Sequence, residues 1–376
     1  MRTRIYVAVP RSSPKPDADV AELPEYPKLN LSINPPFPVM EAKLVAEIPT
    51  KGNWQYEPKF DGFRGLVFRD RETVIIQSKA GQPLERYFPE LVAALLQIPD
   101  EHFVIDGEIV VSIHGHLDFD ALLQRIHPAA SRIQRLSRET PASINLFDLL
   151  ETSGRVLTDQ PLRERRKALQ EWAEQNLQGI PALRLAPVTH DVAQANRWLS
   201  ELAGEGYDGV IAKLLDEPYH SGDRRGMQKI KRIRTADCVV GGFRYASKGG
   251  VIGSLLLGLY NENGKLDHIG YTSSFTAEER ADVAEKVQSA MPQHGEPAGF
   301  TGSAPGGPSR WNAYNPRAAE WTALVPKLVV EVSYDHFSGG RFRHGTKIVR
   351  WRPDKDPHQC TKEQVAPVKT AISNKQ

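Results

Sequence analysis

The chain has very little cysteine, since Cys238 and Cys360 are the only two among its 376 residues. Their spacing matches no zinc site, and two cysteines are too few for a disulfide framework. Also missing is any apolar run near the roughly 18 residues that a membrane-spanning helix needs, and the first twenty residues hold no secretory apolar segment. The sequence therefore predicts a protein of the reducing cytoplasm without a membrane span.

An excess of charge of one sign is missing as well. The 48 basic and 46 acidic side chains leave a formal net charge of +2, which is too small to indicate a nucleic-acid partner by itself. The apolar fraction of 40% and the charged fraction of 25% are ordinary for a globular protein. Any surface for a polyanion must therefore be local.

The length and the texture of the chain predict two domains, because a single hydrophobic core usually stops growing below 376 residues. Repeated prolines without a regular period predict an extended leader over residues 1–30. We expect a first domain over residues 31–235, a second over 236–360 and a tail over 361–376. The boundary near residue 235 follows from a change to short β-rich runs separated by glycines.

The periodicity of apolar residues predicts an α+β first domain and a small β-barrel after it. In the first domain we expect strands at residues 65–68, 73–77, 103–105 and 108–111, and helices at 89–96, 119–126, 162–176 and 192–203. In the second we expect strands at 238–243, 254–260 and 327–334, one helix near 276–291, and a flexible glycine-rich loop at 292–308.

Residues 57–64, Glu-Pro-Lys-Phe-Asp-Gly-Phe-Arg, place a lysine, two acids and an arginine in a turn between two strands. For Lys59 to attack phosphorus its ammonium group must lose a proton, and neighbouring cations and partial burial favour that loss. An isolated lysine in a turn is more often a surface charge. The hypothesis of a nucleophilic lysine therefore depends on the rest of the chain.

Three further segments supply charged groups in an ordered series. Residues 106–108, Asp-Gly-Glu, follow an apolar run and would present a carboxylate at a strand bend to a metal or a sugar hydroxyl. Residues 207–213 do the same with Asp208 and end in a lysine. Residues 228–231, Gln-Lys-Ile-Lys, alternate, so that both lysines share one face of a strand and suit a phosphate.

The last basic stretch, residues 341–355, holds six arginines and lysines against one acid, with two aromatic residues between them. Such a composition suits a phosphate backbone. A solvated strand face is the alternative interpretation. A second basic block at residues 224–234 surrounds the two lysines of the preceding motif. His114, His116 and His127 have no metal-ligand spacing and are read as surface residues.

In this order and at these separations, the motifs resemble the covalent nucleotidyltransferase superfamily of ATP-dependent DNA ligases, RNA ligases and capping enzymes. The resemblance spans roughly residues 36–355. The chain looks most like stand-alone bacterial ligase C and next like the ligase module of bacterial ligase D. It implies an α+β, ATP-grasp-like adenylation domain followed by an oligonucleotide-binding (OB-fold) barrel, and an ATP-dependent DNA ligase that acts in repair with Mg²⁺ or Mn²⁺.

The resemblance also implies a role for each motif residue near the nucleotide. Lys59 would form a lysyl-AMP phosphoramidate, and Glu57 would accept a hydrogen bond from the adenine amino group, which favours ATP over GTP. Phe147, which alone would more often be a core residue, would stack on the adenine ring. Arg64 would contact the ribose or the nick phosphate, and Glu108 would hold the ribose or a catalytic metal.

The remaining implied roles concern metal, phosphate and DNA. Asp208 stands where many ligases have glutamate, and it would bind the metal together with Glu108 through a shorter side chain. Residues 352–355, Arg-Pro-Asp-Lys, resemble the R-x-D-K motif that orients the departing pyrophosphate. The further nucleotide-binding candidates are Lys213, Lys229, Lys231, Arg352, Asp354 and Lys355. The DNA-binding candidates are Lys79, Arg64, Arg341, Arg343 and Lys347.

The expected partners are nicked or broken duplex DNA and, by family resemblance, Ku and a primase-type repair polymerase, with the chain itself a monomer. Two other functions stay open. An RNA ligase or a capping guanylyltransferase shares the lysine chemistry, although Glu57 and the expected barrel favour the DNA enzyme. A non-catalytic DNA-binding module would explain the basic stretch but not the ordered carboxylates and lysines.

Overall fold

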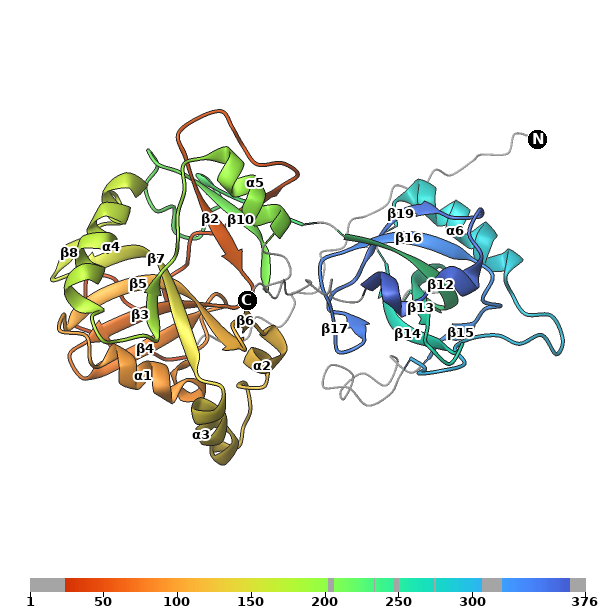
Figure 1. Ribbon diagram of the computed structural model, residues 1–376, viewed down its shortest axis with the longest axis horizontal. Helices are drawn as coiled ribbons and strands as arrows, with labels where there is room; N and C mark the ends of the chain where they lie inside the picture. Colours follow the sequence, from red (N-terminus) through yellow and green to blue (C-terminus); the bar gives the residue numbers. More distant parts are fainter. Residues whose placement is uncertain are drawn as a thin grey trace, which may run out of the picture.

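The computed structural model describes residues 24–201, 206–232, 234–246, 250–273, 275–305 and 320–365. Most of the expected leader, the end of the glycine-rich loop and most of the expected tail lie outside these ranges. The described chain forms two bodies, a mixed α and β body and a smaller barrel-like body (Figure 1). Within the described ranges, each helix is too short or too polar to cross a bilayer.

Two sheets form the first body. The smaller has the order β1-β11-β10-β2, with bounds β1 Lys43–Val45, β2 Trp54–Phe60, β10 Tyr207–Leu214 and β11 Met227–Lys231. The larger has the order β4-β3-β5-β7-β8, and β6 and β9 pair with β5 and β7. Its bounds are β3 Phe63–Asp70, β4 Thr73–Ser78, β5 His102–Ile113, β6 His116–Leu117, β7 Ala142–Thr152, β8 Arg155–Val156 and β9 Leu183–Leu185.

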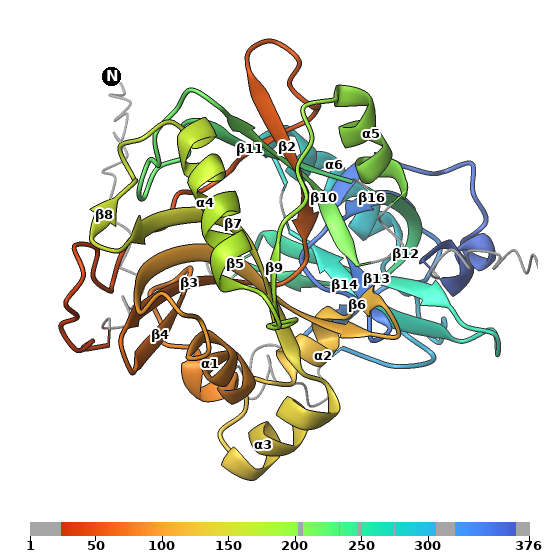
Figure 2. The ribbon, with the colours of Figure 1, turned by 60° about the vertical axis from the view of Figure 1, so that its left-hand side comes forward.

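Helices flank the larger sheet, and one helix packs on a face of the smaller sheet (Figure 2). They are α1 Pro89–Leu95, α2 Phe119–Leu123, α3 Ala130–Glu139, α4 Leu162–Asn176 and α5 Val192–Glu201, with a 3₁₀ turn η1 at Glu85–Tyr87. The expected helix at 162–176 is confirmed and that at 89–96 ends one residue early. The prediction for 119–126 was too long, and α3 was not predicted.

One expected break in the larger sheet is wrong. Residues 103–105 and 108–111 belong to a single strand, β5, and its pairing with β7 shifts register between Asp106 and Gly107. A bulge of this kind re-aims side chains without ending the strand. The Asp-Gly-Glu motif therefore lies within one continuous strand, at a point where the pairing is irregular.

The N-terminal segment from residue 24 onward packs over the larger sheet. Leu29, Ile33 and Met40 are buried in one apolar cluster with Leu66 and Phe68 of β3. Glu151 of β7 accepts backbone hydrogen bonds from residues 32 and 33, which fixes this segment on the sheet. As a result, residues 39–42 become part of the wall of the site described below.

The second body has the strand order β14-β13-β12-β16-β19, with β15 on β12. Its elements are β12 Arg234–Tyr245, β13 Ile252–Tyr260, β14 Leu266–Thr272, α6 Ala277–Ser289, β15 Thr322–Ala323, β16 Val329–Tyr334, β17 Phe337–Ser338, β18 Arg341–Phe342, β19 Lys347–Trp351, η4 Pro357–Gln359 and η5 Lys362–Val365. A parallel bridge between Thr272 and Thr346 joins the far edges and closes the barrel. The predicted order of an α+β body followed by a small barrel is confirmed.

Candidate active site

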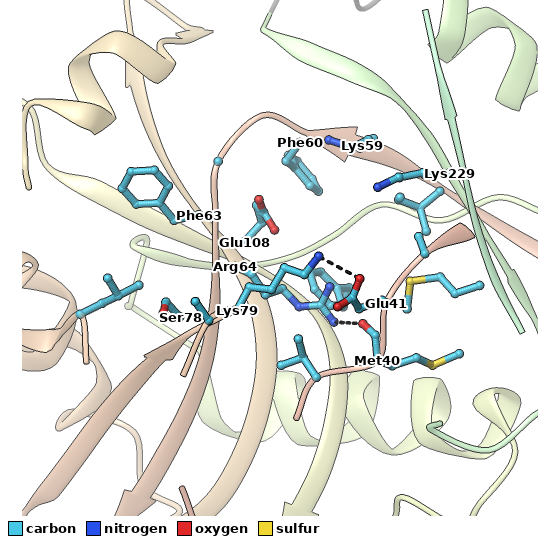
Figure 3. Close-up of a pocket in the computed structure, with 18 of the residues that line it drawn as sticks. Met40, Glu41, Lys59, Phe60, Phe63, Arg64, Ser78, Lys79, Glu108 and Lys229 are labelled. Atoms are coloured by element: carbon cyan, nitrogen blue, oxygen red, sulfur yellow. Dashed lines mark hydrogen bonds and ion pairs between the residues drawn. The ribbon is translucent and has the colours of Figure 1, made fainter. Parts of the chain in front are cut away.

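A cavity of about 830 Å³ lies between the two sheets of the first body. Its walls come from β2, β10 and β11 on one side and from β3, β5 and β7 on the other, with residues 39–42 and the turn after β4 at its rim (Figure 3). Several residues predicted from the sequence line it together: Glu57, Lys59, Arg64, Lys79, Glu108, Phe147, Lys213 and Lys229.

Strand register explains why the motifs meet. Lys59 of β2 pairs with Gly209 of β10, and the register shift between Tyr207 and Gly209 leaves Asp208 as an extra residue beside the lysine. Gly209 has φ +143, and a Cβ there would lie 2.0 Å from the carbonyl oxygen of Ile230. Only glycine fits this position. The conformation of Gly209 therefore directs the carboxylate of Asp208 toward Lys59.

The glycine of the first motif has a related role. A Cβ on Gly62 would lie 2.3 Å from the carbonyl oxygen of Ile109 and 2.9 Å from Cγ of Glu108. Its absence lets the turn between β2 and β3 lie directly against β5. In the next strand pair Arg64 stands opposite Glu108. The turn therefore leads from the strand of Lys59 to the strand that places Arg64 opposite Glu108.

Lys59 is held as a charged ammonium in this conformation. Burial alone would lower its pKa, but the neighbouring carboxylates, first among them Asp208 at 2.7 Å from Nζ, together raise the pKa above its ordinary value. Glu108 and Asp61 act in the same direction. The expectation that the surroundings of Lys59 favour loss of its proton is therefore wrong here. A reactive amine requires that Asp208 first be drawn to other partners.

Asp208 is itself fully engaged. One carboxylate oxygen contacts the ammonium groups of Lys59 and Lys231, at 2.7 and 3.1 Å, and the other lies 2.8 Å from Nε2 of His336 in the barrel. Burial would raise the pKa of Asp208, but these partners, His336 first, hold it well below its usual range. His336 was not foreseen, because only the fold brings it here from 128 residues away.

Glu108 is different, because within the described part of the chain no hydrogen bond or ion pair reaches its carboxylate. Burial raises its pKa to about 7, although Lys59 and Arg64 oppose this shift. A carboxylate that lines the cavity without a directly paired cation suits a hard divalent metal. The described residues contain no ready cluster of three or more metal-ligating side chains. Glu108 and Asp208 are the two carboxylates that would hold a divalent cation here, and its charge would offset that of a bound anion.

The opposite end of the cavity holds a buried acid and a lysine. The Glu57 carboxylate lies 2.9 Å from Nζ of Lys213 and accepts a hydrogen bond of the same length from Gln55. Phe147 of β7 lies under two cations, with the Lys213 ammonium 4.3 Å and the Arg64 guanidinium carbon 4.5 Å from its ring centroid. An acid and an aromatic ring that contact the same lysine and line one cavity can recognise a purine base.

The phosphate side of the cavity gathers cations. Lys79 and Arg224 converge on the Glu41 carboxylate, at 3.0 and 3.2 Å (Figure 3 shows the first pair). The pKa of Lys229 is lowered by burial and by neighbouring cations, Lys79 first. Such mutual repulsion is relieved by an anion, so this rim is suited to phosphate. Glu41 was missed because nothing in the sequence marks the acid that holds Lys79 in the absence of substrate.

The barrel reaches the site through the hairpin β17–β18 and the residues beside it. The guanidinium of Arg343 donates to both oxygens of Asp61, at 2.7 and 3.0 Å, and lies 4.0 Å from the ring centroid of Phe119. Asp335 lies 3.5 Å from Lys231. Arg343, predicted to contact DNA, is thus a contact between the two bodies in this conformation, and its DNA role stays a prediction.

The R-P-D-K segment does not line the cavity. Arg352 pairs with Asp237 of β12 at 3.1 Å and with Asp354 at 2.9 Å, and Lys355 lies 2.6 Å from Asp237. Their predicted roles at the nucleotide require a different placement of the barrel. Of the remaining DNA-binding candidates, Arg341 lies 3.3 Å from the ring of His268, and Lys347 is exposed on β19.

Two family descriptions match most of the chain. "ATP dependent DNA ligase domain" matches residues 39–231, and "ATP dependent DNA ligase C terminal region" matches residues 248–355. These matches identify the first body as a ligase nucleotidyltransferase domain and the barrel as an OB-fold domain. The boundaries predicted at residues 30, 235 and 360 stay predictions.

Similar proteins extend the match over nearly the whole chain. "DNA ligase C1" of Mycolicibacterium smegmatis is 44% identical over 90% of this chain and 96% of its own length. "DNA ligase C" of Mycobacterium tuberculosis is 42% identical over 92% and 98%. A "Multifunctional non-homologous end joining DNA repair protein LigD" of Mycobacterium tuberculosis is 31% identical over 82% of this chain but only 37% of its own length.

A solved structure agrees at the level of the fold. A structure described as "Structure-function analysis of Lig E DNA ligases" matches with a TM-score of 0.51 and 17% identity, over 84% of this chain and all of that one. At such identity the likeness concerns the fold alone. The ligase domain of LigD from M. tuberculosis has 28% identity over 85% of this chain and 97% of its own, with a TM-score of 0.41.

Proposed function

The chain belongs to the ATP-dependent DNA ligases, and we propose that Lys59 is the nucleophile that carries AMP during the reaction. The observation that supports this role is the shared cavity, which Lys59 lines together with Glu57 at the base-reading end and Lys229 at the phosphate end. An ATP molecule that spans the two ends brings its α-phosphate to Lys59. As a DNA ligase that uses ATP, the enzyme joins a 3′-hydroxyl to a 5′-phosphate.

In the first step, the Nζ of Lys59 forms a bond to the α-phosphorus while the bond to the bridging oxygen breaks and pyrophosphate departs. The lysine must lose a proton first, so its ion pair with Asp208 has to open. Lys229 and Lys231 stand on the same face of β11 and stabilise the charge that develops on the phosphate oxygens. Glu57 accepts from the adenine amino group, and Phe147 supports the base.

A divalent metal, Mg²⁺ or Mn²⁺, is proposed at Glu108 and Asp208. When bound it neutralises charge on the phosphate oxygens of ATP. This proposal rests on the unpaired, desolvated Glu108 carboxylate and on the chemistry of the donor pair. Asp208 reaches such a metal only after it leaves Lys59 and His336, which links metal binding to release of the lysine.

In the second and third steps AMP moves to the 5′-phosphate of the nick and the 3′-hydroxyl then displaces it. Lys79 is proposed to bind that 5′-phosphate, in exchange for Glu41. Arg341, Arg343 and Lys347 of the barrel are proposed to face the DNA backbone. Since the R-P-D-K segment is proposed to serve ATP, the barrel must change its placement between steps.

The cellular setting is proposed from relatives. The LigD relative carries non-homologous end joining in its name, and this chain spans only part of that protein. We propose that the enzyme acts in break repair at the nucleoid, as a monomer, with a Ku-like end-binding protein and a primase-type polymerase as partners. Ligation of duplex ends with and without such a protein tests the partnership.

The chemistry is tested by incubating the protein with α-³²P-labelled ATP or GTP and a divalent metal, followed by electrophoresis under denaturing conditions. We expect label from ATP alone, loss of the label in Lys59→Ala, retention in the exposed control Lys51→Ala, and discharge by nicked DNA. Label from GTP would indicate a capping enzyme. Absence of label from both nucleotides would overturn the proposed chemistry.

A further inference from the structure

A buried tyrosine lies directly behind the wall of the active site. Tyr219 belongs to the connection between β10 and β11, and only 5% of its surface is exposed. Its hydroxyl donates a hydrogen bond to Oδ2 of Asp106 at 2.7 Å and accepts one from the backbone N–H of Met40 at 3.0 Å. Neither Tyr219 nor Asp106 was assigned a role from the sequence.

Asp106 connects this tyrosine to Arg64. Asp106 is fully buried, and the guanidinium of Arg64 donates to both of its oxygens at 2.5 Å. A terminal nitrogen of Arg64 also lies 3.4 Å from the carbonyl oxygen of Met40 (Figure 3). Arg64, Asp106, Tyr219 and the backbone of Met40 therefore form a closed ring of hydrogen bonds. Of these groups, Arg64 and Met40 line the cavity.

This ring joins three separate parts of the domain. Arg64 and Asp106 lie on β3 and β5 of the larger sheet, Tyr219 follows β10 of the smaller sheet, and Met40 belongs to the N-terminal segment. The tyrosine ring is buried in the apolar cluster that contains Met40 and Leu66. Since burial and the charge of Asp106 raise the pKa of Tyr219 well above its ordinary value, the hydroxyl keeps its proton and continues to donate.

We propose that Tyr219 is a positioning residue that sets the orientation of Arg64 toward the substrate. A two-pronged contact with Asp106 fixes the plane of the guanidinium only as firmly as the carboxylate is fixed. The Tyr219 hydroxyl holds the carboxylate oxygen that also receives the terminal nitrogen of Arg64. Without the hydroxyl, the carboxylate turns more freely, and the arginine meets the ribose or phosphate oxygen in a less uniform geometry.

The proposal rests on the role of Arg64 in the ligase reaction proposed above. It specifies that Tyr219 acts on catalysis only through Arg64, although it touches no substrate. Loss of the hydroxyl should therefore change the same reaction step, and the same kinetic parameter, that a change of Arg64 itself affects. A tyrosine needed only for folding would instead change stability without this selectivity.

The test compares Tyr219→Phe with a matched control, Tyr56→Phe. Tyr56 is 2% exposed, and its hydroxyl donates to the carbonyl oxygen of Pro49 at 2.7 Å, in a different apolar cluster. Each substitution removes one buried hydroxyl and keeps the ring. We expect similar small losses in melting temperature, but only Tyr219→Phe should lower the rate constant, by about 3- to 30-fold.

The rate constants are measured at saturating substrate for self-adenylation with ATP and for sealing of a pre-adenylated nick, in wild type, Tyr219→Phe, Arg64→Lys and the double variant. We expect Tyr219→Phe to impair whichever step Arg64→Lys impairs, and to add less than about 2-fold in the Arg64→Lys background. Equal effects of Tyr219→Phe in both backgrounds would overturn the proposal. So would a wild-type rate in Tyr219→Phe.

The same measurements distinguish a failure of the Tyr219 proposal from a failure of the role of Arg64 or of the proposed ligase chemistry. If Arg64→Lys itself reacts at the wild-type rate while Lys59→Ala takes no label, the ligase chemistry stands and the role of Arg64 is wrong, which also overturns positioning through it. If wild type takes no label from ATP, the proposed function fails before the tyrosine is tested. The melting temperatures exclude misfolding as the cause of a lower rate.

Discussion

The active-site cavity and the R-P-D-K segment are predicted to act on the same nucleotide. The residues of the cavity already lie together, whereas those of the R-P-D-K segment are bound elsewhere. In the cavity, side chains from separate strands meet around one space, and Lys59 already lies 2.7 Å from Asp208. In the R-P-D-K segment, Arg352 and Lys355 both pair with Asp237 of their own barrel. The residues of the cavity are therefore already assembled. The R-P-D-K segment is instead held at Asp237, outside the cavity, and we call it stored in this sense.

The difference follows from what positions each set. Strand register within one domain places Lys59 beside Asp208 and Arg64 opposite Glu108 as soon as the domain folds. The R-P-D-K segment depends on where the barrel sits, and here the barrel presents Arg343 to Asp61 instead. If the R-P-D-K segment closes over ATP as proposed, that closure and the docking of the hairpin β17–β18 would belong to different steps.

The largest effect is expected for the double substitution Arg352→Ala and Lys355→Ala, which tests whether the R-P-D-K segment and the docked hairpin serve different steps. If these cations serve only the ATP step, self-adenylation should fall by at least about 100-fold, because two charges that stabilise the departing pyrophosphate are lost. Sealing of a pre-adenylated nick should change by less than about 2-fold. Single-turnover rates of both reactions measure this.

The control for this double variant is Lys362→Ala, which removes a lysine paired with Asp267 at 2.6 Å elsewhere in the barrel. It should leave both rates near wild type. An equal loss of both reactions in the double variant would contradict the assignment of the R-P-D-K segment to the ATP step.

The second test concerns the contact that is made in this conformation. Arg343→Ala removes the two-pronged ion pair with Asp61 and the packing on Phe119. We expect sealing of a pre-adenylated nick to fall by about 10- to 100-fold, since a partly buried charge loses its partner. Self-adenylation should fall by less than about 3-fold.

Arg350→Ala is the matched control, because Arg350 is an exposed arginine of the barrel that pairs with Glu331 at 2.6 Å within the same sheet. A loss of sealing in Arg350→Ala as large as in Arg343→Ala would assign the effect to general loss of positive charge near DNA. A loss of self-adenylation in Arg343→Ala equal to the loss of sealing would contradict the separation of steps.

Many of the residues that meet in the cavity were predicted from the sequence. Lys59, Glu108 and Lys229 stand in short motifs with fixed local geometry, and β-strand alternation correctly put both lysines of residues 228–231 on one face. The helix at 162–176 and the order of an α+β body before a barrel were also predicted. Such features depend on local periodicity and on glycines at positions whose backbone conformation no other residue accepts.

The missed residues share a different property. Glu41, Tyr219, His336 and Asp237 act through partners far along the chain, such as Asp208 for His336, 128 residues away. No local sequence pattern identifies an acid such as Glu41, which pairs with Lys79, or a tyrosine such as Tyr219, which contacts Arg64 through Asp106. The charge state of Lys59 was also mispredicted, because it depends on the distance to Asp208 rather than on the neighbouring sequence.

A smaller effect of opposite sign comes from Asp237→Asn. This change keeps the shape of the side chain but removes the charge that holds Arg352 and Lys355. If their storage opposes the ATP step, self-adenylation should rise by about 2- to 5-fold at limiting ATP, because less electrostatic attraction must be broken. Rates across ATP concentrations measure this. An unchanged or lower rate in a variant with wild-type melting temperature would contradict the idea of a stored segment.

The smallest expected effect separates the two bodies by their response to acid. Burial, together with Arg341 and Arg244, lowers the pKa of His268 in the barrel from 6.5 to about 4. A group whose pKa is lower in the folded state binds its proton more readily when unfolded. The barrel therefore loses stability as pH falls from 6.5 toward 4, and keeps this contribution above 6.5. In the cavity, Asp208 stays ionised over this window because its pKa lies well below it, whereas Glu108, whose pKa is raised to about 7, takes up a proton in the folded state and opposes the loss of stability as pH falls. Urea unfolding at pH 7.5 and 4.5 should show that wild type loses about 1–3 kcal/mol more than His268→Gln. The exposed control His294→Gln should lose as much as wild type. An equal loss in His268→Gln and wild type would mean that the buried imidazole does not make the barrel sensitive to acid.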